Sequence, residues 1–344
     1  MPDMVDIKSF FNKSKKQIAA AAAIVIVVSA VIFFHNRGPD AAYYQTEMEA
    51  RRAAFSALVS AIEKFGADIA FYYKDLSDGF EYSYKGDEKY PSASLVKVPV
   101  MACVYSAIEE GRLSPYQKII YRPRHKTGGS GSIRRSRFGR KFGIEELTYR
   151  MIVESDNVAT NMLCEALGLG YINEKMINWG FSVTDMKRWV LDLKRRNQGI
   201  ENYTTAKEMG ILLEKIYRGE LVSGESSVKM INIMKHQLHR NRIPRYLPSD
   251  IEVANKTGLM RDVVHDAGII FSPAGDYILV VLTRDLPSRK GARVIGEVSY
   301  AVYNAHMEGA KNRRGGGATL ATLNDRNPDT TKSVTASVSH LEQQ

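Results

Sequence analysis

The chain has 344 residues, of which 44% are hydrophobic and 25% charged, so it can bury a sizeable core and is not disordered throughout. Its two cysteines, Cys103 and Cys164, are too few for a disulfide scaffold and lack metal-ligand spacing; we interpret them as small buried residues in preference to one structural disulfide. The formal net charge of +10 predicts anionic surroundings without choosing between lipid headgroups, a cell-wall polymer and nucleic acid.

An uninterrupted apolar run covers residues 18–34, and three lysines precede it. The run is at the short end for a helix that spans a membrane. The lysines predict a cytoplasmic N-terminus over residues 1–17, with the rest of the chain outside. Small residues at 28–30 leave a cleaved signal peptide as the alternative, although the apolar run continues past them. We favour an uncleaved transmembrane signal anchor, and either interpretation exports the domain that follows.

Helical and strand-like patterns alternate along the rest of the chain. The first elements predicted are a helix and two strands joined by a turn: 40–65, 69–74 and 80–84. A helix begins near Ser94, and helical patterns dominate three later stretches: 144–166, 205–218 and 226–239. Strand patterns then return and are followed by a helix: 251–256, 267–271, 277–283 and 294–306. From Gly309 to Gln344 the sequence has no periodicity and predicts a disordered tail.

Strands therefore cluster at the two ends of the domain, and helices fill its middle. The simplest packing unites early and late strands in one antiparallel sheet, flanked by helices from both chain ends, and makes the middle a helical lobe. The predicted fold class is α+β, with the domain at residues 40–308. A cleft between sheet and lobe would bring Ser94, the central helices and the late strands together.

A loop over residues 122–141 is dense in arginine, lysine and glycine. It has few aromatic residues for base stacking and lies on an exported domain, so we expect no nucleic-acid binding. The remaining interpretations are a solvated loop and a contact with an anionic surface or polymer of the cell envelope.

Ser94 and Lys97 lie three residues apart at the start of a predicted helix. That spacing places both side chains on one face, where the amine can take the serine proton. The lysine would have to be neutral, which requires a pKa lowered by burial and neighbouring charge. A Ser-x-x-Lys pair is expected by chance about once in a chain of this length, so an exposed helix start is the alternative.

Two further motifs follow in order. Ser155-Asp-Asn157 lies within the helical middle, and Lys256-Thr-Gly258 ends the first late strand. The ordered set resembles class A β-lactamases and penicillin-binding proteins. The resemblance covers roughly residues 43–305 and includes three surrounding segments: 129–133, 243–248 and 265–268. A second Lys-Thr-Gly at 126–128 precedes Ser-Asp-Asn and runs into a glycine loop, so we treat it as a chance match.

The resemblance implies a role for each motif. Ser94 would form an acyl-enzyme, Lys97 would accept its proton, and Ser155 would relay a proton to the leaving nitrogen. The residues implied to bind substrate are Asn157, Lys256, Thr257 and Gly258. Backbone N–H groups of Ser94 and Leu259 would form the oxyanion hole. We expect no cofactor and no metal.

The sequence departs from class A β-lactamases in the loop after Ser-Asp-Asn. That family carries a loop glutamate and a nearby asparagine that together activate water for deacylation. We do not find this motif in residues 186–197. Asp192 is the nearest carboxylate and the candidate deacylation base; a surface or helix-capping role is the alternative. We expect intact acylation and impaired deacylation. Leu259 and Met260 are bulkier than the residues usual after Lys-Thr-Gly, which predicts a narrower pocket.

Four functions remain open. The first is a β-lactamase-type serine hydrolase anchored in a bacterial cell membrane, with its catalytic domain extracytoplasmic and β-lactams as substrates. The second is a carboxypeptidase or transpeptidase that acts on D-alanyl-D-alanine stem peptides of peptidoglycan. The third is a non-catalytic cell-wall binding module, which the intact motifs disfavour. The fourth is an esterase that uses His265 and Asp266, which the absence of a G-x-S-x-G elbow disfavours.

Overall fold

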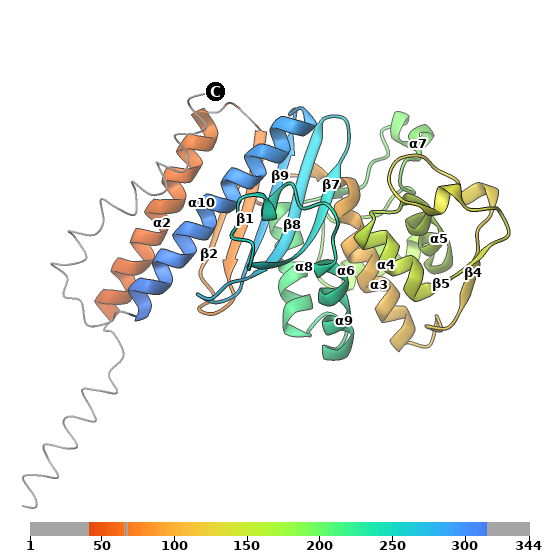
Figure 1. Cartoon of the computed structure of the whole chain (residues 1–344), viewed down its shortest axis with the longest axis horizontal. Coiled ribbons are helices and arrows are strands. Elements are labelled where there is room, and N and C mark those ends of the chain that lie inside the picture. Colours follow the sequence, from red (N-terminus) through yellow and green to blue (C-terminus); the bar gives the residue numbers. More distant parts are fainter. Residues whose placement is uncertain (1–40, 65, 67, 315–344) are drawn as a thin grey trace, which may run out of the picture.

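The computed structural model describes residues 41–314 except residues 65 and 67. Its main feature is a five-stranded antiparallel sheet in the order β2-β1-β9-β8-β7 (Figure 1). The strands are β1 (Asp68–Asp75), β2 (Glu81–Tyr84), β7 (Glu252–Leu259), β8 (Val263–Phe271) and β9 (Tyr277–Arg284). Early and late strands thus share one sheet, which confirms the predicted α+β class.

Both faces of the sheet are buried, because alternate residues of each central strand enter different core layers. In β1, Ile69, Phe71 and Tyr73 pack into one layer, whereas Ala70 and Tyr72 pack into the other. The sheet therefore needs helices on both sides, and the chain supplies them from different regions.

The helices from the two chain ends cover the first face. α2 (Ala41–Lys64) and α10 (Ser288–Arg314) lie side by side there, as Figure 1 shows. A buried polar cluster fastens them to the sheet. Arg51 of α2 donates to Asp75 of β1 (2.8 Å), and His306 of α10 lies 2.8 Å from the hydroxyl of Tyr73.

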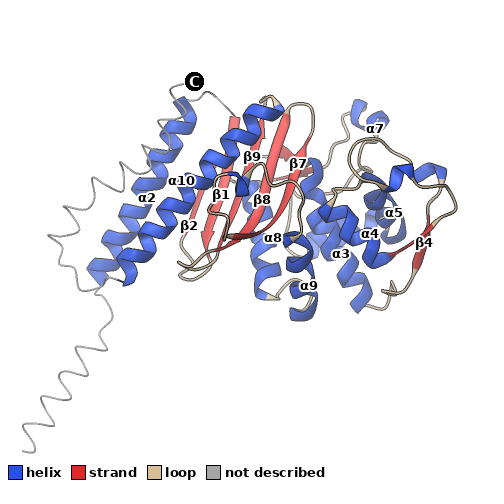
Figure 2. Cartoon of the chain, in the orientation of Figure 1, coloured by secondary structure: helices blue, strands red, loops and turns tan. Residues whose placement is uncertain are grey.

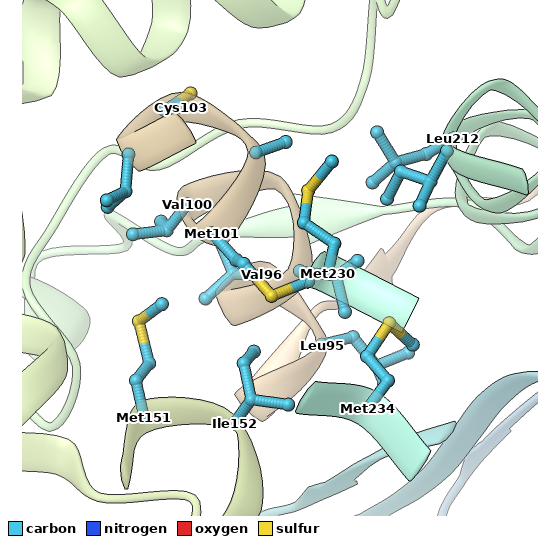
Figure 3. Close-up of a cluster of buried hydrophobic side chains, with 14 of the residues drawn as sticks. Leu95, Val96, Val100, Met101, Cys103, Met151, Ile152, Leu212, Met230 and Met234 are labelled. Atoms are coloured by element: carbon cyan, nitrogen blue, oxygen red, sulfur yellow. The ribbon is translucent and has the colours of Figure 1, made fainter. Parts of the chain in front are cut away.

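The second face carries the helical lobe, coloured blue beside the red sheet in Figure 2. Its helices are α3 (Lys97–Glu109), α4 (Ile144–Val153), α5 (Asn157–Leu167), α6 (Leu169–Asn178), α8 (Ala206–Arg218) and α9 (Gly224–Lys235). α3 runs through the centre of this core. Figure 3 shows Val100 and Met101 of α3 among Met151, Ile152 and Met230 of the surrounding helices.

Two short ladders complete the lobe. β3 (Tyr90–Pro91) pairs with β6 (Tyr203–Thr204), and β4 (Lys118–Ile120) pairs with β5 (Lys141–Gly143). The first ladder fixes the chain immediately before Ser94 to the end of the loop over residues 186–202. The second closes the basic segment over residues 122–141 at its base.

The structure differs from the predicted elements at several points. The helical stretch 144–166 is two helices, because Asp156 caps α5 and Ser155 adopts a left-handed backbone (φ 54°). α6 was not predicted. α10 continues to Arg314, past the predicted start of the tail at Gly309; the rest of that tail lies outside the described residues.

The predicted N-terminal segment and anchor, residues 1–34, also lie outside the described residues. Among the helices that the structure does describe, none combines the length and the apolar character needed to cross a membrane.

We expect Gly210→Ala to destabilise the fold although alanine is the better helix former. A Cβ at Gly210 of α8 would lie 2.2 Å from the ring of Tyr72, which is buried and tied to Glu81 through its hydroxyl. Overpacking of this kind costs about 1–3 kcal/mol. Urea denaturation would measure the loss.

Gly170→Ala in α6 is the matched control, since a Cβ there meets nothing within 4 Å. It should leave the free energy of unfolding unchanged or raise it by up to about 1 kcal/mol. Equal stability of the two variants would contradict the packing of α8 on β1.

Candidate active site

Ser94 lies in a single turn of 3-10 helix, η1 (Ala93–Val96), that leads directly into α3. The turn starts with strain, because Ala93 has φ 46°, a conformation that costs a non-glycine residue about 1–3 kcal/mol. The carbonyl of Pro91, three residues before Ser94, accepts a hydrogen bond from His265 Nε2 (2.9 Å). This hydrogen bond ties the segment before the turn to β8.

Lys97 follows one turn later and is fully buried. Its Nζ lies 2.8 Å from the Ser155 carbonyl, 3.1 Å from Ser155 Oγ and 2.7 Å from Asn157 Oδ1. Burial lowers the pKa of Lys97 to about 7, and the negative charge of Asp156 opposes part of that shift. The predicted neutral lysine is therefore well populated near neutral pH, and the amine contacts Ser155 and Asn157.

Ser155 stands between two buried amines. Its Oγ is 3.1 Å from Lys97 Nζ and 3.0 Å from Lys256 Nζ. Burial also lowers the pKa of Lys256 well below its usual value, and the positive charges of Lys97 and Arg242 lower it further. Two ammonium groups around one oxygen would repel each other, so the arrangement favours at least one neutral amine.

The neutral form of Lys97 sets a direction for the proton. A neutral amine has two N–H donors and one lone pair, whereas an ammonium has three donors. Lys256 Nζ can donate to Ser155 Oγ, which leaves the Ser155 hydroxyl proton free to point at the Lys97 lone pair. The geometry thus joins the base predicted for Ser94 to the serine predicted to relay a proton.

The left-handed backbone at Ser155 places this hydroxyl, and the residues that follow hold it. Asp156 accepts from the N–H groups of Ala159 and Ile133, both at 2.9 Å, so it caps α5 and ties down the glycine loop. Asn157 donates through Nδ2 to the Gly128 carbonyl (3.0 Å).

Two glycines allow the glycine loop to approach this closely. A Cβ at Gly131 (φ 105°) would lie 2.2 Å from the Asp156 carboxylate, and one at Gly129 (φ 74°) would lie 2.6 Å from Asn157 Nδ2. The glycines before Ser-Asp-Asn are therefore a packing requirement.

β7 is an edge strand of the sheet, and it brings Lys256 to Ser155 and Gly258 to Ala93. Gly258 makes the approach close, because a Cβ there would lie 3.3 Å from the Cβ of Ala93. The N–H of Met260 donates to Val263 (3.0 Å), so the alternating antiparallel pattern turns the N–H of Leu259 away from β8. The predicted oxyanion donors, Ser94 and Leu259, thus both have N–H groups outside the ladder and line one cavity.

We call this the catalytic cavity; its volume is about 230 Å³. It is lined by Ala93, Ser94, Gly129, Ser130, Asn157, Arg188, Val190, Leu191, Leu193, Arg196, Glu201, Asn202, Leu259 and Met260. Leu259 and Met260 form part of its wall, and the narrower pocket expected from their size stays a prediction. Among the residues that the structure describes, no group of His, Cys, Asp and Glu side chains has the arrangement of a metal site.

The structure does not bring Asp192 to the catalytic cavity. Asp192 is the N-cap of α7 (Leu193–Asn197), where its carboxylate accepts from the N–H of Arg195 (3.1 Å). This placement favours the helix-capping alternative over the role of deacylation base.

Glu201, which the motif search missed, is the carboxylate in the wall of this cavity. It forms ion pairs with Arg188, and with Arg196 at 3.2 Å, and it accepts from the N–H of Asn202 (2.8 Å). Glu201 therefore serves to close the loop over residues 186–202. The sequence could have indicated this ion pair, because Arg188 and Glu201 lie near the two ends of the loop.

Arg242 is a second residue that the motifs did not reveal. It is buried and donates to the His265 carbonyl (3.1 Å), and its positive charge helps to lower the pKa of Lys256. The segment 243–248, which is part of the family resemblance, begins directly after Arg242.

The esterase alternative is wrong on geometry. Burial lowers the pKa of His265 to about 4, and its ring is held by Pro91 and Thr283. Asp266 turns instead to Asn255 and the N–H of Ile243. The two side chains do not meet, as expected for neighbours on a strand.

The two cysteines are buried and free, as the sequence predicted.

A family model described as the β-lactamase enzyme family matches residues 51–306. The chain belongs to that family. It is 24% identical over 277 residues to the β-lactamase regulatory protein BlaB of Streptomyces cacaoi, a match that covers 66% of this chain and 87% of BlaB. The predicted resemblance to class A β-lactamases and penicillin-binding proteins is confirmed.

Solved structures with the same fold include both kinds of protein. A β-lactamase from Sphaerobacter thermophilus DSM 20745 is 30% identical, covers 74% of this chain and 95% of its own, and superposes with a TM-score of 0.68. A mutant of PBP-A, an acyl-enzyme complex with penicillin G, is 26% identical with a TM-score of 0.69 and coverages of 74% and 96%. The family fold is thus that of serine hydrolases.

We expect Gly131→Ala to disrupt the site. The added Cβ would collide with Asp156 and force a left-handed backbone on alanine, so both the α5 cap and the Ser155 turn should shift. Strain and the lost cap together predict a loss of about 2 kcal/mol or more in unfolding free energy. Thermal or urea denaturation would measure it.

Gly128→Ala is the neighbouring control. A Cβ at Gly128 meets nothing within 4 Å, and its backbone is not left-handed, so stability should stay within about 0.5 kcal/mol of the parent. If Gly131→Ala were equally harmless, the glycine loop would not support Ser-Asp-Asn in the way described.

Proposed function

We propose that the protein is a penicillin-binding serine hydrolase: β-lactams acylate Ser94, and the acyl-enzyme is hydrolysed slowly. One observation carries the proposal. The Ser155 hydroxyl lies between two buried amines, one of which has a pKa of about 7, beside a cavity that Ser94 lines. A nucleophilic serine, a neutral lysine base and a serine hydroxyl that can relay a proton are the groups that serine acylation at neutral pH requires.

Acylation follows from these positions. Ser94 Oγ attacks the carbonyl carbon of the β-lactam amide while its proton passes to neutral Lys97. The N–H groups of Ser94 and Leu259 stabilise the negative charge on the carbonyl oxygen, an effect worth about 3–4 kcal/mol for a well-placed donor. The C–N bond then breaks. The nitrogen takes the Ser155 proton, and Ser155 recovers one from Lys97.

The substrate is bound on both sides of the reacting bond. In this proposal Lys256 and Thr257 bind the carboxylate of the leaving part, and Asn157, which lines the cavity, holds an amide of the acyl part. The contact of Lys256 with Ser155 and the close approach at Gly258 support the first assignment. The buried guanidinium of Arg242, whose positive charge acts on Lys256, favours an anionic leaving part.

Slow deacylation is proposed from the chemistry of the cavity wall. Hydrolysis needs a group that takes a proton from water. Of the described residues that line the cavity, Glu201 carries the carboxylate, and two arginines already bind it. Val190 of the same loop also lines the cavity and is apolar. The PBP-A mutant, a similar structure, is an acyl-enzyme complex with penicillin G.

A D-alanyl-D-alanine carboxypeptidase or transpeptidase reaction is the second candidate. It uses the same acylation step, and the lack of a free carboxylate in the cavity wall favours it over rapid β-lactam turnover. The non-catalytic binding module is disfavoured because Ser94, Lys97, Ser155 and Lys256 are assembled at one site. The regulatory protein BlaB nevertheless belongs among the relatives, so activity has to be measured.

The location is part of the proposal. We infer a single-pass protein of a bacterial cell membrane, with residues 18–34 as the anchor and the hydrolase domain outside the cytoplasm. The apolar run and its preceding lysines support this placement.

Intact-protein mass spectrometry after mixing with benzylpenicillin tests the proposal. We expect one stable adduct that is absent from Ser94→Ala. Asp192→Ala is the informative companion, because Asp192 caps α7 at the surface. The adduct lifetime in this variant should stay within about twofold of the parent, as for other surface substitutions.

A rapidly vanishing adduct would show efficient β-lactamase turnover and contradict slow deacylation. The absence of any adduct in the parent protein would contradict acylation itself. A lifetime that lengthened sharply in Asp192→Ala would restore Asp192 as the base.

The acylation rate should rise with pH through about 7, where Lys97 loses its proton in the folded protein. Below that pH the amine is charged and cannot accept the Ser94 proton, so the rate should fall about tenfold per pH unit. Stopped-flow labelling with a fluorescent penicillin from pH 5.5 to 9, values chosen to span about 7, would give the profile.

Lys97→Met should label far more slowly at every pH and lack the inflection. A parent profile that stayed flat between about pH 6 and 8 would mean that Lys97 is not the proton acceptor.

A further inference from the structure

A second cavity lies beside the catalytic one, and the proposed acylation does not use it. Its volume is about 520 Å³, and it is lined by Lys126, Thr127, Gly128, Arg134 and Arg135. We call it the basic cavity. It belongs to the segment 122–141, which carries eight arginine and lysine residues and no aspartate or glutamate.

The positive charge in this cavity is not neutralised by the described part of the protein. Three carboxylates contact the segment 122–141, and all three are already engaged. Glu165 pairs with Arg124 and the buried His125, and Glu154 pairs with Arg150. Asp156 accepts from the N–H groups of Ile133 and Ala159. Among the ion pairs of the described residues, none involves Lys126, Arg134 or Arg135.

Like charges held close together repel, and an anion placed among them is attracted. Lys126 and the two arginines are exposed, so an incoming ligand can reach them. Arginine binds carboxylate and phosphate groups with paired N–H donors, which suits a ligand with planar or tetrahedral anionic groups.

The basic cavity adjoins the catalytic cavity through consecutive residues. Gly128 lines the first, and Gly129 lines the second. Asn157, placed to hold an amide of the acyl part, donates to the Gly128 carbonyl at 3.0 Å. A substrate whose acyl part passes Asn157 therefore reaches the basic cavity next, while its leaving part lies at Lys256 on the opposite side.

We propose that the basic cavity binds an anionic group, a carboxylate or a phosphate, carried on the acyl part of the substrate. The inference rests on the proposed function and narrows its substrate class. Acyl donors with a negative charge beyond the amide react faster with Ser94 than neutral donors of the same shape.

Two penicillins provide a matched pair. Carbenicillin differs from benzylpenicillin by a carboxylate on the acyl side chain. The measurement is the second-order rate constant for acylation of Ser94 by each, in the parent and in R134Q/R135Q. Each exposed ion pair contributes little, so the loss of two should lower the carbenicillin to benzylpenicillin ratio by about twofold to thirtyfold in the variant.

The benzylpenicillin rate itself should be unchanged in R134Q/R135Q, which shows that the fold and the acylation machinery are intact. K229Q/R218Q is the charge control, since it removes two exposed cations from α9 and α8 without touching either cavity. It should preserve the ratio. Added salt should lower the ratio of the parent, because exposed charges are screened over about 8 Å at physiological ionic strength.

The outcomes separate the two proposals. If neither penicillin labels the parent, the proposed function fails, and this inference fails with it. If both label it and the ratio is the same in R134Q/R135Q, the inference alone is wrong. The inference would also be overturned if the carbenicillin to benzylpenicillin ratio were unchanged and R134Q/R135Q co-sedimented less with anionic lipid vesicles than the parent does. That result would assign the two arginines to a membrane contact.

Discussion

Two lysine amines share one serine hydroxyl inside the protein, and the rest of the site depends on that arrangement. A buried ammonium costs several kcal/mol of solvation free energy, and a second one nearby adds repulsion. The protein offsets part of this cost with hydrogen bonds to Ser155 and Asn157 and with the negative charge of Asp156. The remainder appears as a lowered pKa, which is the property that makes Lys97 a base.

The fold supplies this arrangement by holding three segments that are far apart in the sequence. Lys97 is fixed by α3, which the helical lobe surrounds. Ser155 is fixed by the break between α4 and α5, where Asp156 caps the second helix. Lys256 is fixed by β7 at the edge of a sheet whose other strands are packed on both faces. Close contacts at Gly131 and Gly258 then set how near these segments come to one another.

The sequence predicted those features that depend on periodicity or on ordered motifs. Short runs rich in aromatic, aliphatic and β-branched residues predicted the strands of the sheet. Ser-x-x-Lys, Ser-Asp-Asn and Lys-Thr-Gly predicted the centre of the site. It did not predict the helix break at Ser155, because the apolar pattern runs on across it and only the backbone conformation differs. It also placed the loop carboxylate at Asp192. Distance along the chain favoured Asp192, whereas Arg188 and Arg196 draw Glu201 into the cavity wall.

The loop over residues 186–202 shows how acylation and deacylation can be separated in one fold. Its carboxylate is used for structure, since Glu201 joins the two ends of the loop through Arg188. Val190 of this loop lines the cavity and is apolar, so it offers no carboxylate to a water molecule there. Its N–H donates to Asn161 Oδ1 (3.1 Å), which fixes its position. In the proposed mechanism acylation needs none of these residues, because its proton path runs through Lys97 and Ser155. We therefore propose that such a loop leaves the first half of the reaction intact and withholds a base from the second. The lifetime of the proposed acyl-enzyme would then be set by the loop and its formation by the lysines.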